Sequence, residues 1–435
     1  MANKKKNSSV KSIVFLSILC VLVLVFLAAV GIGAWNHSSS LIQDRVFLDM
    51  MSTYFDKLPR KITQKDLDSI AYVSFSGTDA LNLGDSEVLK SQLEENSDGA
   101  QSPKEVGVPS SFDFESCMAL LGGLKYLDIS GNPDCVSSVS QVASLKSVEH
   151  LVLKDTSFED LGALSSMTAL KSLDISGVKV SDTGFLSSLN ALEKLNITDT
   201  GIQDLSCLAS LSSLTNLIAD ENGLKTLNGI ENLSALTSLS LAQNEIADLG
   251  DMQNFTALKD LKLSGNQIAS LAALSNLTSL ENLYVSENEI TSLEHVATLT
   301  GLTSLVADEN QLASLSGVEG LPSLETLSAA GNEITDVSIL AGLGNLKSLT
   351  LSRNQIADVS ALANMASLTK LELANNQISD ASPLANLTSL TTLDVSFNRI
   401  ADLTVLDALE ENGTSVSSGS QTTEEGAAEE TATEE

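Results

Sequence analysis

An asparagine recurs every 22 residues along most of the chain, and no other feature limits the fold as strongly. The column comprises Asn222, Asn244, Asn266, Asn288, Asn310, Asn332, Asn354, Asn376 and Asn398. The same step backwards reaches Thr200, Val178 and Thr156 and then, after a two-residue insertion, Asn132. A leucine stands five residues before each of these 13 positions, from Leu127 to Leu393. A fixed period of this length indicates stacked, near-identical coils rather than one globular core.

Each unit divides into two segments of expected structure. The unit around Asn244 reads Leu239-Ser-Leu-Ala-Gln-Asn-Glu-Ile-Ala-Asp-Leu, a leucine-rich repeat consensus. Its alternating Leu-x-Leu run predicts a short β-strand, and leucines spaced by three predict a tight helical or 3₁₀ turn on the opposite side. The asparagine carries donors and an acceptor that can satisfy backbone groups in the turn after the strand. We therefore expect an α/β solenoid, a right-handed superhelix or horseshoe with a parallel β-sheet on its concave face and short turns on its convex face.

The segments around the repeats differ from them in composition. Four lysines within residues 1–12 precede a 23-residue apolar run from Ile13 to Trp35. A run of this length spans a bilayer as a helix, and the lysines predict a cytoplasmic N-terminus. We therefore expect a transmembrane signal anchor at 13–35, an extracellular repeat domain at 113–412, and a disordered acidic tail at 413–435. The alternative is a secreted protein, cleaved near Ala34.

Residues 36–112 should form a juxtamembrane segment and an N-terminal cap, because an open solenoid end needs covering. Apolar spacing predicts a short helix at 46–55, Thr63 is a plausible helix start, and 71–77 is typical of a strand. The polar stretch from Asp85 to Val106 predicts a mobile acidic insertion.

Cysteines and histidines give little support for chemistry. Cys117 and Cys135 are close enough in sequence to pair, but small apolar packing residues are the favoured interpretation. His37, His150 and His295 have no nucleophile, carboxylate or metal motif at a recognisable spacing. We predict no catalytic residues, no enzyme activity and no cofactor. A net charge of -32 argues against nucleic acid as a partner.

The candidate binding residues precede the Asn column, on what should be the concave face. They are Asp199, Asp220, Glu221, Tyr284, Glu287, Asp308, Glu309, Arg353, Glu372, Asp394 and Phe397. Acidic residues on neighbouring coils should repel one another at strand spacing, so a basic protein partner would be favoured. A Ca²⁺ ion at Glu287, Asp308 and Glu309 is a weaker alternative. Solvated charges that only keep the protein soluble are the simplest interpretation.

The repeat L-x-x-L-x-x-L-x-L-x-x-N-x-I-x-D-L, with the stretch Ile378-Ser-Asp-Ala-Ser-Pro-Leu, resembles the internalin-type repeats of Gram-positive surface proteins. The resemblance covers about residues 114–411 and extends to the cap at Thr63–Ile70. It implies a cell-surface protein. The chain shows neither the immunoglobulin-like domain nor the Leu-Pro-x-Thr-Gly signal that many internalins carry, so host-cell invasion is not carried over.

Together these features predict a membrane-anchored extracellular protein that mediates protein–protein interaction or adhesion through its concave face. The alternative is a structural spacer that organises the envelope by binding cell-wall polymer or by self-association.

Overall fold

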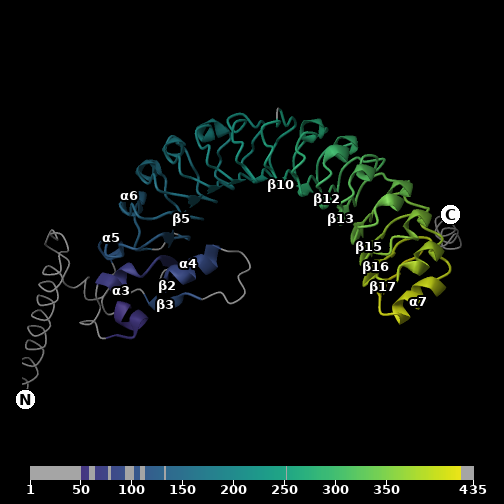
Figure 1. The fold of residues 1–435 in the computed structure, drawn as a ribbon, viewed down its shortest axis with the longest axis horizontal. Helices are drawn as coiled ribbons and strands as arrows, with labels where there is room; N and C mark the ends of the chain where they lie inside the picture. Colours follow the sequence, from purple (N-terminus) through teal and green to yellow (C-terminus); the bar gives the residue numbers. More distant parts are fainter. Residues whose placement is uncertain are drawn as a thin grey trace, which may run out of the picture. The chain divides into compact units, whose positions relative to one another are not determined.

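The computed structural model describes residues 50–57, 64–76, 80–93, 102–107, 113–131, 134–250 and 252–422. The chain divides into two compact units, Met1–Leu192 and Glu193–Glu435. Figure 1 colours their helices and strands by their order in the sequence. Within the described ranges no helix is both long and apolar enough to cross a bilayer. The predicted anchor at 13–35 and the cleavage alternative at Ala34 lie outside those ranges.

Unit 1 begins with a small β-sheet. Strand β1 (Tyr72–Ser76) pairs antiparallel with β2 (Ala80–Gly84), and β2 pairs antiparallel with β3 (Lys104–Gly107). Helix α3 (Gln64–Asp68) precedes this sheet. Residues 50–55 are also helical, within the short helix predicted at 46–55. The predicted strand at 71–77 is confirmed, and β1 supplies the first strand of the ladder because it also pairs in parallel with the first coil.

The prediction of a mobile insertion from Asp85 to Val106 is wrong for most of its length. Helix α4 (Ser86–Leu93) begins there, capped by the Asp85 carboxylate, which accepts from the N–H groups of Glu87 and Val88. Strand β3 lies at its other end. Two apolar residues, Val88 and Val106, are buried, and their burial organises an otherwise polar stretch. Residues 94–101 lie outside the described ranges.

The repeats of unit 1 follow the cap. Helices on their outer side are α5 (Phe114–Met118), α6 (Val139–Ala143), η2 (Gly162–Ser166) and η3 (Leu186–Ser188). Strands β4 (Tyr126–Asp128), β5 (His150–Val152) and β6 (Ser172–Asp174) form a parallel ladder. Cys117, Cys135 and Cys207 are thiols rather than half-cystines, so the pairing of Cys117 with Cys135 is not made.

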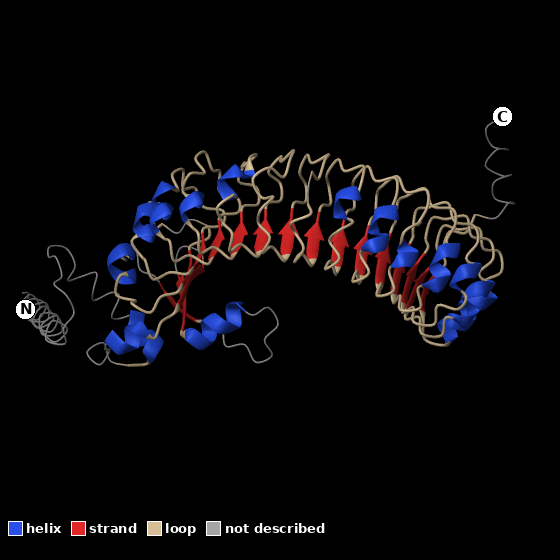
Figure 2. Ribbon diagram, turned by 45° about the horizontal axis from the view of Figure 1, so that its top comes forward, coloured by secondary structure: helices blue, strands red, loops and turns tan. Residues whose placement is uncertain are grey.

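Unit 2 repeats one coil many times, with strands on the inside of its bend and helical turns on the outside (Figure 2). The strands are β7 (Lys194–Asn196), β8 (Asn216–Ile218), β9 (Ser238–Ser240), β10 (Asp260–Lys262), β11 (Asn282–Tyr284), β12 (Ser304–Val306), β13 (Thr326–Ser328), β14 (Ser348–Thr350), β15 (Lys370–Glu372), β16 (Thr392–Asp394) and β17 (Ser415–Ser417). The helical turns are η4 (Leu205–Leu208), η5 (Ala272–Leu274), η6 (Glu294–Thr298), η7 (Val318–Gly320), η8 (Ser338–Gly342), η9 (Ser360–Leu362), η10 (Ser382–Asn386) and α7 (Thr404–Glu411). The predicted parallel strands and 3₁₀ turns are therefore confirmed.

The leucine column sets the register of this sheet. Each column leucine lies directly opposite the leucine of the next coil, as Leu261 lies opposite Leu283 and Leu283 opposite Leu305. These side chains are fully buried. A one-residue slip would turn the whole column outward, so burial fixes the pairing.

The Asn column forms the hydrogen-bond ladder that the sequence predicts. The amide nitrogen of Asn288 donates to the carbonyl of Val285 in its own coil and to that of Leu263 in the preceding coil, at 3.1 and 3.0 Å. Its amide oxygen accepts from the N–H of Ile268 at 3.0 Å. The same pattern holds from Asn244 to Asn398. Asn132 lies outside the described residues.

Threonine replaces part of this function in the early coils. The hydroxyls of Thr156 and Thr200 donate to the carbonyls of Leu153 and Ile197, three residues earlier in their own coils. A hydroxyl therefore stands in for the asparagine amide as a donor at these two positions. Val178 has no such group and is fully buried.

The repeat array extends past residue 412, which corrects part of the predicted disordered tail. Strand β17 pairs in parallel with β16, and Val416 lies opposite Leu393. Gln421 takes the ladder position, because its Oε1 accepts from Ile400 N–H and its Nε2 donates to Val395. This coil does not match the repeat consensus for three reasons. The step from the preceding unit is 23 residues instead of 22, valine replaces the column leucine, and glutamine replaces the column asparagine. Residues 423–435 lie outside the described ranges.

Candidate binding surface

The outward-facing side chains of the strands in unit 2, here called the strand surface, alternate with the buried leucines. At its middle lie Lys262, Tyr284 and Val306, on the adjacent strands β10, β11 and β12. The Lys262 ammonium lies 5.8 Å from the centre of the Tyr284 ring, within cation–π range. Tyr284 is thus where the sequence predicted it, and Lys262 is an addition to the predicted set. This cluster joins an aromatic, an aliphatic and a cationic side chain on an ordered sheet.

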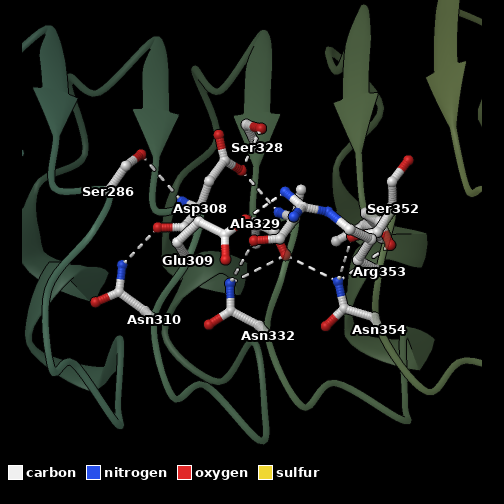
Figure 3. Close-up of polar contacts among 12 residues, drawn as sticks. Ser286, Asp308, Glu309, Asn310, Ser328, Ala329, Asn332, Ser352, Arg353 and Asn354 are labelled. Carbon is white, nitrogen blue, oxygen red and sulfur yellow. Dashed lines mark hydrogen bonds and ion pairs between the residues drawn. The ribbon is translucent and has the colours of Figure 1, made fainter. Parts of the chain in front are cut away.

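The carboxylates of Asp220 and Asp308 form hydrogen bonds within the fold. One carboxylate oxygen of Asp308 accepts from the Ser328 hydroxyl at 2.6 Å and from Ala330 N–H at 2.7 Å, both in the next coil (Figure 3). Asp220 makes the same two contacts, with Ser240 and Ala242, both at 2.7 Å. Each carboxylate therefore supplies an acceptor for a backbone N–H group of the next coil. Both aspartates lie in the same four-residue sequence, Ala-Asp-Glu-Asn, at 219–222 and at 307–310.

The residue directly before the Asn column, here called the turn edge, has a left-handed backbone in every unit where its angle is known. Glycine occupies it at Gly131, Gly177, Gly265 and Gly331. The other turn-edge residues at positive φ are Asp155, Asp199, Glu221, Gln243, Glu287, Glu309, Arg353, Asn375 and Phe397. This backbone costs a residue with a side chain about 1 kcal/mol relative to glycine. Six of the predicted binding residues thus follow a strand in a strained turn instead of lying on it.

Turn-edge side chains lean along the coil axis. A Cβ built on Gly331 would meet the carboxylate of Glu309, one coil earlier, at 2.7 Å. Because Gly331 has no side chain to fill this space, Glu309 reaches across it. Glu309 forms an ion pair with Arg353, which lies one coil after Gly331 and two coils after Glu309 (Figure 3). Asp155 and Gln243 lie in the same way over Gly177 and Gly265. Glu309 and Arg353, both predicted as ligand contacts, are therefore partners of each other.

The proposed Ca²⁺ site at Glu287, Asp308 and Glu309 is not formed by this arrangement. Asp308 is directed to Ser328 and Ala330, and Glu309 to Arg353. Throughout the described ranges, no group of three or more His, Cys, Asp or Glu side chains is placed to hold a metal ion. The carboxylates do not converge because Asp308 and Glu309 are each directed to another partner. Asp199, Glu221 and Glu287 remain as exposed turn-edge carboxylates.

The last predicted contacts lie on β15, β16 and the turn after β16. Glu372 accepts from the Thr350 hydroxyl at 3.1 Å and pairs with Lys370 at 2.8 Å. Asp394 caps Ser396, accepting from its N–H at 2.9 Å and its hydroxyl at 2.6 Å. Phe397 differs from both, because its side chain is 53% exposed and its φ is 54°.

Two clusters in unit 1 escaped the sequence prediction. Tyr72 stacks on Tyr126 with ring centres 4.6 Å apart, and Tyr126 lies 6.5 Å from the His150 ring. Beside this stack, Glu149 pairs with Lys125 and Lys171 at 2.7 and 2.8 Å. Tyr126 and His150 stand six residues before the Asn-column positions of their units. The ion-pair residues stand seven residues before those positions. Reading those columns across coils would have found them.

The comparisons with known proteins agree with this fold. The family model for Leucine Rich repeats (2 copies) matches residues 256–298, 322–364 and 366–408. The crystal structure of InlF, an internalin from Listeria monocytogenes, is 27% identical with a TM-score of 0.64, covering 82% of this chain and 95% of that chain.

More distant structures share the fold. A leucine-rich repeat protein of Leptospira interrogans is 21% identical with a TM-score of 0.59, covering 71% of this chain and 92% of that chain. The Toll–Spatzle complex of Drosophila is 20% identical with a TM-score of 0.56, covering 71% of this chain and 52% of that chain. Comparison with curated protein sequences gave no match. The repeat consensus, the Asn ladder and the similarity to InlF place this chain among the internalin-like leucine-rich repeat proteins.

Proposed function

We propose that the chain is a membrane-anchored extracellular protein whose strand surface in unit 2 binds a protein ligand. The observation that carries the proposal is the cluster of Lys262, Tyr284 and Val306 on three adjacent strands. Tyrosine is typical of interface hot spots, and side chains on a hydrogen-bonded sheet lose little further freedom on binding. Leucine-rich repeat chains in general mediate protein–protein interaction.

Two distant structures with the same fold were solved as complexes with partners. They are a plant peptide hormone receptor, RGFR1, in complex with RGF2, and the Toll–Spatzle complex. They support a protein ligand for this chain at the level of fold. The acidic charge of -32 supports a partner with a basic surface, since opposite charges accelerate encounter.

The glutamates at the turn edge would be the contacts for such a basic surface. Both Glu221 and Glu287 are exposed; Glu221 precedes the central cluster along the chain, and Glu287 follows Tyr284 within it. Asp220, Asp308 and Glu309 contribute to the electrostatic field, but their carboxylates are held by internal donors. Direct ligand contacts should therefore come from Tyr284, Lys262 and Glu287 rather than from the aspartates.

The test is site-specific photocrosslinking in the full chain expressed in its own membrane. A photoreactive residue replaces Tyr284 on the strand surface or, as the matched control, Ser314 on a helical-turn loop. We expect one protein adduct from position 284 and none from position 314. The purified adduct partner should bind Tyr284→Ala at least about tenfold more weakly than wild type, as for a hot spot.

Two results would contradict the proposal. The first is equal adducts from both positions. The second is retention of the full chain on purified cell-wall polymer that Tyr284→Ala leaves unchanged, with no protein adduct. The second result would favour the structural role in the envelope.

A further inference from the structure

Phe397 is the most anomalous residue at the turn edge of unit 2. Its backbone is left-handed, with a φ of 54°, and its ring is 53% exposed. Other coils place glycine, a small or amide-bearing polar residue or a charged residue at this position. A bulky residue in this backbone region is an outlier, and the ring is only half covered, so burial offsets little of the strain. Local backbone propensity does not account for phenylalanine here.

Small residues surround the turn that carries Phe397. Its N–H donates to the carbonyl of Gly419 in the next coil, at 3.0 Å. The next turn-edge residue is Ser420, and the preceding one is Asn375. Side chains at this edge lean along the coil axis, as Glu309 does over Gly331. We call the half-exposed ring of Phe397 the knob.

The charge beside the knob is opposite to that of the whole chain. Arg399 follows two residues after Phe397 and is exposed, whereas the chain carries a net charge of -32. The turn-edge cation Arg353 already pairs with Glu309. Arg399 thus places an exposed cationic residue two positions along the chain from an exposed aromatic residue. Aromatic and arginine side chains are the two types most enriched at interface hot spots.

We propose that Phe397 and Arg399 form a docking knob for a partner protein that presents an apolar recess beside a carboxylate group. The ring fills the recess, and the guanidinium pairs with the carboxylate. The knob lies at the turn edge after β16, whereas the central cluster lies on β10–β12. It requires an acidic rather than a basic partner surface, so the inference stands independently of the function proposed above.

The test uses the full chain and a library of random peptides displayed on phage as the probe. The library is first depleted of peptides that bind the Phe397→Asn variant, and binders to wild type are then selected. Asparagine removes the ring and is a residue suited to the left-handed backbone. We expect sequences that combine aromatic or aliphatic residues with Asp or Glu. Phe397→Asn should weaken the best synthetic peptide by about tenfold or more, and Arg399→Gln by severalfold.

Three controls separate docking from packing. Leu403→Asn removes another exposed apolar side chain of unit 2 and should leave the affinity unchanged. Tyr284→Ala should also leave it unchanged, which distinguishes this surface from the strand surface. Phe397→Asn should melt at the same temperature as wild type or higher, because the strain is relieved.

The inference is overturned by any of three results. These are peptides that bind wild type and Phe397→Asn equally, a selection dominated by Lys and Arg, or a lower melting temperature for Phe397→Asn. The last would show that the ring contributes packing.

Discussion

At the scale of single residues, most polar side chains near the strands have internal partners. Asn288 satisfies four backbone groups in two coils, and Asp308 caps a backbone donor of the next coil. The energy of these contacts comes chiefly from avoiding buried unpaired groups. Substitutions at the ladder should therefore affect stability, whereas those at Tyr284 or Phe397 should affect binding.

We predict that Asn288→Ala lowers the free energy of unfolding by about 3 kcal/mol, because it leaves buried carbonyls and an N–H group without partners. Asn288→Thr should cost less, because a hydroxyl can donate within its own coil as Thr200 does. Urea denaturation measures both changes. Hydrogen exchange should localise the loss at the amide of Ile268. Equal costs for Ala and Thr would contradict the assignment.

We predict that Gly331→Ala destabilises unit 2 by about 1–2 kcal/mol. The residue has a φ of 64°, and its new Cβ would meet the Glu309 carboxylate at 2.7 Å. The matched control is Gly344→Ala, where nothing lies within 4 Å. Thermal melting of both variants gives the comparison. If Gly331→Ala left the melting temperature unchanged, the Glu309–Arg353 pair would move aside without a cost in stability.

The ion-pair network of Glu149 predicts a pH dependence for unit 1. Hydrogen bonds from Lys125 and then Lys171 lower the pKa of Glu149 to about 2. A carboxyl group with a lowered folded-state pKa stabilises the protein above its unfolded pKa of about 4.3 and loses this contribution as pH falls toward 2. The lysines are 42% and 47% exposed, so the contribution should be near 1 kcal/mol.

The check is the melting temperature of wild type and Glu149→Gln between pH 6 and pH 2. Wild type should be the more stable at pH 6, and the difference should shrink below pH 4.5. A difference that stays constant across this range would refute the role of the network.

At the scale of elements, the end coils decide how the ladder is closed. In unit 1, β1 continues the parallel register into a cap whose other strands are antiparallel. In unit 2, α7 buries Leu406 and Leu409, and β17 and Gln421 complete the last coil. Solenoid ends need such covers because each coil otherwise exposes an apolar face.

We predict that truncation after residue 411 lowers the melting temperature of the protein by several degrees, because β16 and the Asn398 turn lose their partners. Truncation after residue 422 is the matched control, and it should leave melting unchanged. Differential scanning calorimetry of both chains provides the measurement. Identical melting of the two chains would mean that the last coil adds no stability.

At the scale of the whole molecule, the predicted anchor decides where the binding surfaces are presented. We predict that the full chain stays in the membrane fraction after carbonate washing, whereas a chain starting at Asn36 is released. Protease added to intact cells should digest the repeats of the full chain. N-terminal sequencing that begins near Asn36 in the wild-type protein would instead establish cleavage and secretion.

The sequence by itself determined the repeat, its register and the identity of the core. A period of 22 residues with an unbroken leucine column leaves one register that buries every leucine. It also determined the Asn ladder, because one residue type at one position meets the same backbone groups in each coil. The cap strand at 72–76 followed from its own apolar pattern.

Only the tertiary structure decided which charged residues remain available. Asp308 and Glu309 are neighbours in sequence, but one caps the next coil and the other reaches over Gly331 to Arg353, 44 residues later in the chain. The last coil was hidden as well, since Gln421 reaches the ladder through a longer side chain and a longer step. Such partners depend on which side chains meet across coils. A repeat consensus does not contain this information, because it records only what the units have in common.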